Sequence, residues 1–273
     1  MKPAPFDFIR AASVAEASRH LKQADGAVRL VAGGQSLGPM LNLRLARPKL
    51  LIDITGIPEL TEIEESGDAV TIGACVTTAA IEDGRVSGRG LDPLASVAMN
   101  IAYRAVRNRG TIGGSFCHAD PAADWVTTLF ALGAECFVAT ENSKRAIPAD
   151  QFIRGAYENA LEPNDVLTAI KVPRLSVGGR WGYYKVCRKA GEFASAMAAV
   201  LRDPDRGIYR AVIGATHGKP ILIADAREMQ SADGSLKESA VVHFLESNGI
   251  ANSLARRQQL AALSRAFAQA RLP

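Results

Sequence analysis

Two glycine-rich segments contain the residues whose types and spacing most clearly suggest chemistry. Consecutive glycines let backbone N–H groups converge on an anion without interference from Cβ atoms, and neighbouring hydroxyl groups add further donors. Neither segment has the spacing GxGxxG or GxxxxGK[ST], so neither a Rossmann fold nor a P-loop is indicated. The two segments are Ala32-Gly33-Gly34-Gln35-Ser36-Leu37 and Arg109-Gly110-Thr111-Ile112-Gly113-Gly114-Ser115.

Either segment alone is compatible with a tight turn between a strand and a helix that binds no ligand. A diphosphate carries two negative charges and many acceptor oxygens, so two such segments could hold it from both sides. The sequence therefore predicts that the segments lie together in the fold and enclose a diphosphate.

The elements around the first segment are short. Residues 28–31 and 50–54 have the pattern of buried strands and bracket the segment, and residues 14–23 have the pattern of an amphipathic helix. Ser13 with Glu16 three residues later forms a capping box for that helix. These elements predict a small α+β unit at the beginning of the chain.

The elements around the second segment alternate in the same way. We expect a strand near 69–76, one helix over 92–107, a loop at the second glycine segment, and a helix with Asp120 as N-cap and Pro121 at its first position. The stretches WGYYKVC, FASAMAAVL and GIYRAVIGAT predict three strands, followed by three helical stretches. A turn-rich region places a domain boundary near residue 175.

Composition excludes several classes of protein. The 273 residues are 48% hydrophobic and 22% charged, which is typical of a globular protein. The net charge of +4 comes from dispersed basic residues, so no nucleic-acid partner is expected. No stretch reaches the roughly 18 apolar residues of a membrane span, and no targeting segment is evident, so we expect a cytoplasmic protein without a membrane span. The four cysteines lack CxxC spacing, which predicts reduced, mostly buried thiols and no metal site.

Two longer stretches resemble a known family. AGGQSLGPMLNLRLARPKLLIDI at 32–54 and VRNRGTIGGSFCHADPAADW at 106–125 are similar to the FAD-binding medium subunit of molybdenum hydroxylases, the xanthine dehydrogenase family. The resemblance extends to EPNDVLTAIKVP at 162–173 and YYKVCRKAGEFASA at 183–196. Carbon monoxide dehydrogenase and quinoline oxidoreductase are members of this family.

The resemblance implies a fold and a division into domains. The implied fold is α+β, with a two-subdomain FAD-binding fold of the vanillyl-alcohol oxidase or p-cresol methylhydroxylase type. A C-terminal α+β domain with a three-stranded antiparallel sheet follows. The FAD-binding domain would cover residues 1–175, with subdomains of about 1–57 and 58–175, and the C-terminal domain would cover 176–273.

The resemblance also implies the cofactor and its residues, with no catalytic residue and no metal ligand in this chain. Gln35 stands where flavin oxidases of the same broad fold carry a histidine that bonds to the flavin, so we expect non-covalent FAD. Phe193 stands where relatives often have tyrosine, and it can lie against the flavin ring but cannot form a hydrogen bond. The implied FAD-binding residues are Ala32, Gly33, Gly34, Gln35, Ser36, Leu37, Thr111, Ile112, Gly113, Gly114, Ser115, Asp124, Leu167, Lys185 and Phe193.

Some of these residues also allow structural interpretations. Asp124 could simply favour the first turn of a helix, and Lys185 could be a solvated strand residue. His118 is expected to be a packed or surface residue. Arg104, Arg107 and Arg109 would usually form a solvated face, although such a face could meet an acidic iron–sulfur partner.

The implied function is electron transfer. FAD would lie between a small subunit with two-iron, two-sulfur clusters and an external acceptor, which could be NAD, dioxygen, a quinone or a redox protein. The organic substrate would react in a large subunit with the molybdenum cofactor. The alternatives are a self-contained flavin oxidase or reductase, which would need its own acid–base group, and an assembly scaffold that has lost flavin.

Overall fold

The computed structural model of the chain describes residues 2–23, 27–231 and 235–271. Its strands form a three-stranded, a five-stranded, a four-stranded and a two-stranded sheet, so the predicted α+β class is confirmed. None of the helices in this described part has the length and apolar character that crossing a bilayer requires.

The three-stranded sheet is parallel and lies at the beginning of the chain, in the order β1-β3-β2. One half of the predicted capping box forms, because the Ser13 hydroxyl accepts from the Glu16 N–H at 3.2 Å. The Glu16 carboxylate accepts from the Ala12 N–H at 2.8 Å, one residue before the N-cap Ser13. The first glycine segment connects the second strand to the second helix. The elements are β1 (Asp7–Arg10), α1 (Val14–Gln23), β2 (Val28–Val31), α2 (Leu37–Asn42) and β3 (Leu50–Asp53).

The five-stranded sheet is antiparallel, in the order β4-β5-β10-β6-β7. Its strands are β4 (Ile63–Glu65), β5 (Ala69–Gly73), β6 (Glu135–Ala139), β7 (Lys144–Pro148) and β10 (Val166–Pro173). The short helix η1 (Pro58–Leu60) precedes β4. Between the strands of this sheet lie α3 (Thr78–Glu82), α4 (Asp92–Ala98), α5 (Arg104–Arg107), α6 (Ile112–His118), α7 (Asp124–Leu132), α8 (Ala149–Phe152) and the small hairpin of β8 (Ile153–Gly155) and β9 (Glu158–Asn159).

The four-stranded sheet is antiparallel, in the order β11-β12-β13-β14. The three expected strands are present, and a short fourth strand extends the sheet beyond the predicted three. The elements are β11 (Arg180–Val186), β12 (Ala196–Asp203), η2 (Pro204–Arg206), β13 (Ile208–Gly214), β14 (Ile221–Ile223), η3 (Arg227–Met229), α9 (Glu238–Ser247) and α10 (Ser253–Gln269).

Two predicted helices differ from the structure. The single helix expected over 92–107 is wrong, because the chain turns between α4 and α5 at Ala102, which has a left-handed φ of 46°. The helix expected to begin at Pro121 begins at Asp124 instead. The Asp120 carboxylate accepts from the Ala122 N–H at 2.9 Å, and this local turn replaces the first helical turn.

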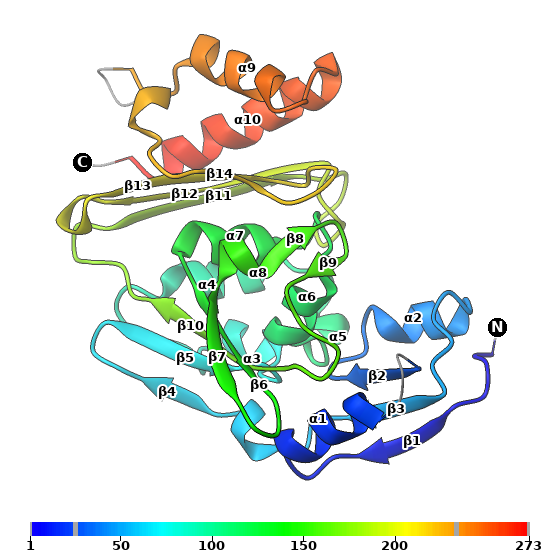
Figure 1. The fold of residues 1–273 in the computed structure, drawn as a ribbon. Helices are drawn as coiled ribbons and strands as arrows, with labels where there is room; N and C mark the ends of the chain where they lie inside the picture. The colour runs from blue at the N-terminus through cyan, green and yellow to red at the C-terminus, as the bar shows by residue number, and fades with distance from the viewer. Residues whose placement is uncertain (1, 24–26, 232–234, 272–273) are drawn as a thin grey trace.

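Helix α7 is the element on which the five-stranded and the four-stranded sheet pack (Figure 1). This helix lies between the five-stranded and the four-stranded sheet, and all of its residues are buried. The apolar cluster around it includes Ala199 of β12 and Val212 of β13 as well as Ile170 of β10. Helices α9 and α10 cover the other face of the four-stranded sheet.

Candidate functional site

The two glycine segments meet in the structure, as the sequence predicts. A Cβ atom on Gly33 would overlap the carbonyl oxygen of Arg109 and would lie 2.8 Å from the Cα of Gly110. A Cβ atom on Gly114 would lie 3.7 Å from the Cβ of Ala32. Segments separated by about 75 residues of sequence therefore form one surface, and glycine at position 33 is required by their close approach.

The first segment presents a row of free backbone donors. Within the described part of the chain, the backbone N–H groups of residues 33–36 donate to no backbone or side-chain acceptor. Gln35 and Ser36 are exposed, and the Gln35 side-chain amide donates back to the carbonyl oxygen of Gly33 at 2.9 Å. Adjacent N–H groups without acceptors are suited to an anion such as a diphosphate.

The second segment differs from the predicted loop, because Ile112 begins helix α6. Its N–H groups have partners inside the protein: Gly113 donates to the Ala74 carbonyl at 3.0 Å, and Gly114 donates to the Thr111 hydroxyl at 3.0 Å. The Ile112 and Ser115 N–H groups donate to the carbonyl oxygens of Val76 and Thr111. These four N–H groups therefore already have acceptors within the protein, whereas the Thr111 N–H group donates to no acceptor among the described residues.

The glycines of the second segment have a packing purpose. A Cβ atom on Gly113 would lie 2.5 Å from the Cβ of Ala74, so the helix backbone packs directly on the end of β5. The hydroxyl groups of Thr111 and Ser115 and the backbone N–H of Thr111 remain as donors that this segment can offer to a ligand.

Asp124 and Lys185 are brought together although they lie far apart in the sequence. The Lys185 Nζ is 2.8 Å from Asp124 Oδ1 and 2.8 Å from the Asn100 carbonyl oxygen. The two side chains are only 8% and 7% exposed, so the interpretation of Lys185 as a solvated residue is wrong. Asp124 is also the first residue of α7, where a carboxylate is favourable.

Tyr183 belongs to the same cluster, and sequence reasoning missed it. Its hydroxyl donates to Asp124 Oδ1 at 2.6 Å. Burial raises the pKa of the Tyr183 hydroxyl well above its usual value, and the negative charge of Asp124 raises it further. Tyr183 and Lys185 are two residues apart on β11, and residues two apart in a strand point to the same face. The strand pattern could therefore have placed both side chains together.

Leu167 and Phe193 lie in very different surroundings. Leu167 on β10 is 3% exposed and belongs to the same apolar core as Ile112. Phe193 lies in the connection between β11 and β12 and is 69% exposed. Leu37 is the half-buried first residue of α2. The structure therefore places Leu167 inside the core and Phe193 on the surface.

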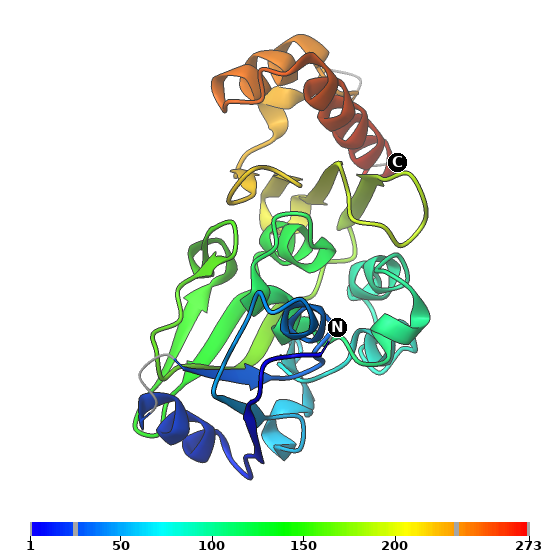
Figure 2. The same ribbon diagram turned by 90° about the vertical axis from the view of Figure 1, so that its right-hand side faces the viewer.

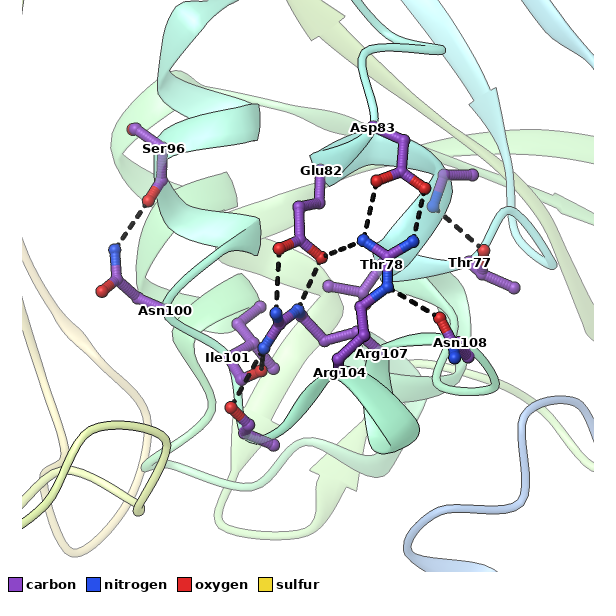
Figure 3. A network of polar contacts seen from close by, with 12 residues as sticks. Thr77, Thr78, Glu82, Asp83, Ser96, Asn100, Ile101, Arg104, Arg107 and Asn108 are labelled. Atoms are coloured by element: carbon purple, nitrogen blue, oxygen red, sulfur yellow. Dashed lines mark hydrogen bonds and ion pairs between the residues drawn. The ribbon is translucent and has the colours of Figure 1, made fainter.

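Two of the arginines expected on a solvated face are engaged within the protein (Figure 3). Arg104 pairs with Glu82 and Asp83, and Arg107 pairs with Glu82. Arg109 is exposed, as expected of a solvated residue.

The remaining reactive side chains are packed. The His118 ring lies against the Tyr157 ring with centroids 5.2 Å apart, which fits the packing interpretation. Cys75 and Cys136 are buried free thiols, and burial raises the pKa of Cys75 to about 12. Among the described residues, no group of three or more histidine, cysteine or acidic side chains is arranged to hold a metal ion.

Sequence comparison identifies relatives of known function. The family described as "FAD binding domain in molybdopterin dehydrogenase" matches residues 4–175. The chain is 41% identical over 201 residues to the carbon monoxide dehydrogenase medium chain of Hydrogenophaga pseudoflava, covering 74% of this chain and 70% of that protein. It is 37% identical to the caffeine dehydrogenase subunit beta of Pseudomonas sp. (strain CBB1), covering 74% and 68%.

Solved structures extend the similarity to nearly the whole chain. Carbon monoxide dehydrogenase from Hydrogenophaga pseudoflava matches with a TM-score of 0.89 and 33% identity, covering 99% of this chain and 98% of that chain. Quinoline 2-oxidoreductase from Pseudomonas putida 86 matches with a TM-score of 0.87 and 28% identity, covering 99% and 98%.

The residues present fit the cofactor of this family. The row of free N–H groups at 33–36 suits the diphosphate of a dinucleotide, and the hydroxyl groups of Thr111 and Ser115 lie on the segment that contacts it. The chain belongs to the family of FAD-binding domains of molybdopterin dehydrogenases.

Proposed function

We propose that this chain is the FAD-carrying electron-transfer subunit of a molybdenum-containing hydroxylase or dehydrogenase complex in the cytoplasm. Electrons would enter from a small subunit with two-iron, two-sulfur clusters and leave to an external acceptor, namely NAD, dioxygen, a quinone or a redox protein. The organic substrate would react in the large molybdenum-cofactor subunit. The observation that carries this proposal is the row of free N–H groups at 33–36, which lies against the second glycine segment.

The residues of the chain have separate tasks in this proposal. FAD supplies the redox chemistry when bound, and the protein positions it and adjusts its electrostatic surroundings. The N–H groups of residues 33–36 and the hydroxyl groups of Thr111 and Ser115 bind the diphosphate and the neighbouring ribityl chain. By the resemblance, Asp124 would lie near the flavin nucleotide, and Leu167, Lys185 and Phe193 would line the flavin. Leu37, Ile112, Gly113 and Gly114 would complete the two segments around the diphosphate and the ribityl chain.

The flavin is held without a covalent bond. An amide nitrogen such as that of Gln35 is not a nucleophile, and this one already donates to Gly33. A self-contained oxidase would need an acid–base group beside the flavin. His118 is a poor candidate for that task because its ring packs against Tyr157.

The absorption spectrum of the purified chain tests the proposal. We expect flavin bands, and we expect acid precipitation to release FAD into the supernatant. The bands should be bleached only when the molybdenum and iron–sulfur subunits and their substrate are added. Direct bleaching by an organic substrate alone would favour the self-contained oxidase, and a chain that takes up no FAD would contradict both.

A further inference from the structure

Arg107 is not one of the proposed FAD-binding residues, yet its side chain makes four hydrogen bonds within the protein (Figure 3). Its Nε and Nη2 donate to the two carboxylate oxygens of Glu82 at 2.7 and 2.8 Å. Its Nη1 donates to two backbone carbonyl oxygens, those of Ile101 at 2.9 Å and Ala102 at 3.1 Å. The side chain is 11% exposed, so this guanidinium group lies against the protein and not in solvent.

The two carbonyl groups belong to a turn that the backbone does not favour. Residues 99–103 connect α4 to α5, and Ala102 has a left-handed φ of 46°. A residue with a Cβ atom in this conformation is strained and persists only where neighbouring groups hold it. Within this turn, the Ile101 and Ala102 carbonyl oxygens accept hydrogen bonds from Arg107 Nη1. Arg107 is therefore one of the groups that stabilise the turn.

The same turn contacts the residues proposed to lie toward the flavin ring. The Lys185 Nζ donates to the Asn100 carbonyl oxygen at 2.8 Å. A Cβ atom on Gly191 would lie 2.6 Å from the Ala102 carbonyl oxygen, so the connection that carries Phe193 rests directly on the turn. The turn therefore underlies both Lys185 and the Phe193 connection.

The surface at this junction is apolar and exposed. Met99 is 58% exposed, Tyr103 is 63% exposed and Phe193 is 69% exposed. Met99 and Tyr103 stand at the two ends of the turn, and Phe193 follows Gly191, which contacts the turn, by two residues. Exposed apolar side chains on two touching segments are suited to a flat, largely apolar ring. In addition, α5 leads directly from this turn into the second glycine segment.

We propose that Arg107 is a positioning residue for the flavin ring. Its guanidinium group anchors to Glu82 with two nitrogens and fixes the turn at 99–103 with the third, so that Met99, Tyr103 and Phe193 form one wall of the ring site. Arginine suits this task because its planar fork can bind a carboxylate and still present another donor. This inference rests on the proposed function, since it assumes that FAD is the ligand.

Arg104 provides a matched control on the same helix. It pairs with Glu82 and Asp83, as Arg107 pairs with Glu82, but its guanidinium group donates only to side chains, including Asn108, among the described residues. It is also 47% exposed. Replacement of Arg104 therefore removes a comparable set of ion pairs and leaves the carbonyl groups of the turn with their donor.

The experiment compares the full-length wild type, Arg107→Met and Arg104→Met, each reconstituted with FAD. We measure the dissociation constant for FAD, the visible circular dichroism of the bound flavin and its midpoint potential. Arg107→Met should weaken FAD binding about tenfold or more and alter the dichroism and the potential. Arg104→Met should change the dissociation constant less than about threefold and leave both other signals unchanged.

The outcomes separate the inference from the proposed function. If Arg107→Met and Arg104→Met have the same effect on the flavin signals, the inference is wrong. If Arg107→Met does not fold, Arg107→Lys takes its place, because lysine can still pair with Glu82 but cannot also bind both carbonyl groups. A flavin signal like that of the wild type in Arg107→Lys would also overturn the inference. Failure of the wild type to take up FAD would instead contradict the proposed function.

Discussion

Single glycines have different tasks in the two segments that resemble each other in sequence. Gly33 allows the two segments to approach, and its own N–H group is free, whereas Gly113 allows a helix to pack on Ala74 and its N–H group is used there. The sequence could predict that both segments meet, since both are rich in glycine. It could not predict which amides are free, because that depends on α6 beginning at Ile112, directly after its N-cap Thr111.

Gly33→Ala should separate the two segments. The new Cβ atom would overlap the Arg109 carbonyl oxygen, and relief of this overlap requires movement of the backbone at an expected cost of about 1–3 kcal/mol. We expect a lower midpoint of thermal unfolding and loss of FAD binding. The control is Gly38→Ala in α2, where no atom lies within 4 Å of the new Cβ atom; an equal loss of FAD binding there would contradict the explanation.

Lys185→Met should destabilise the protein strongly. It would leave the Asp124 carboxylate buried without its cation, and breaking a buried ion pair in this way typically costs about 3–5 kcal/mol. The double variant Lys185→Met with Asp124→Asn removes both charges and should recover part of the loss. Urea unfolding of the three proteins measures this recovery, and a double variant less stable than Lys185→Met would refute the reasoning.

The residues of this cluster show what a sequence can reveal at this scale. Asp124 and Lys185 were predicted from the resemblance, but their contact with each other was not. Strand alternation could place Tyr183 on the same face as Lys185, but the contacts of Tyr183, Asn100 and Arg107 reach across the fold and could not be read from the sequence.

Helices α4 and α5 show where element prediction fails. Apolar residues at helical spacing continue past Ala98, so the pattern indicated a single helix. The structure instead turns at Ala102, and the turn is stabilised by the Arg107 guanidinium group and by the Gly191 connection, both of which are tertiary contacts. The strands β2 and β3 were predicted well because their runs of β-branched and aliphatic residues are a local signal.

The ion pairs between α3 and α5 should make stability depend on pH. A hydrogen bond from Arg107 lowers the pKa of Glu82 below its usual value of 4.5 in the folded protein. A carboxylate with a lowered pKa stabilises the fold above its unfolded pKa, and this contribution is lost as the pH falls through the folded pKa. The contribution should therefore be complete at neutral pH and decline below about pH 4.5.

Glu82→Gln isolates this contribution. The difference in unfolding free energy between wild type and Glu82→Gln should be constant from about pH 7 to pH 5 and should shrink toward pH 3. Chemical denaturation at each pH measures the difference. A difference that grows on acidification would show that another group controls the transition between these elements.

The apolar cluster around α7 joins the C-terminal sheet to the first part of the chain. Figure 2, turned by 90° from Figure 1, shows the C-terminal sheet and helices stacked on the FAD-binding part. The predicted boundary near residue 175 lies between β10 and β11, and the family match also ends at residue 175. We therefore keep residue 175 as the proposed boundary between the two domains. We nevertheless expect the two parts to unfold together, because Ala199 and Val212 pack into the core of the first part.

The two tryptophans can test cooperative unfolding. Trp125 is buried on α7 and Trp181 is on β11, so each reports on a different part. In the variants Trp125→Phe and Trp181→Phe, the remaining tryptophan should unfold at the same denaturant concentration as the far-UV dichroism of that variant. Two separated transitions within either variant would show that the parts unfold independently.

The tight contact between α7 and β13 also restricts how such proteins can exchange parts in evolution. A Cβ atom on Gly214 would overlap the Thr127 hydroxyl and would lie 2.7 Å from Met197 Cγ, so the helix and the sheet are fitted to each other. A chimera that joins residues 1–175 to the C-terminal half of a distant relative would bring together surfaces shaped for other neighbours. Recombination between family members is therefore most tolerable where the segment from α7 to β13 is inherited as one block.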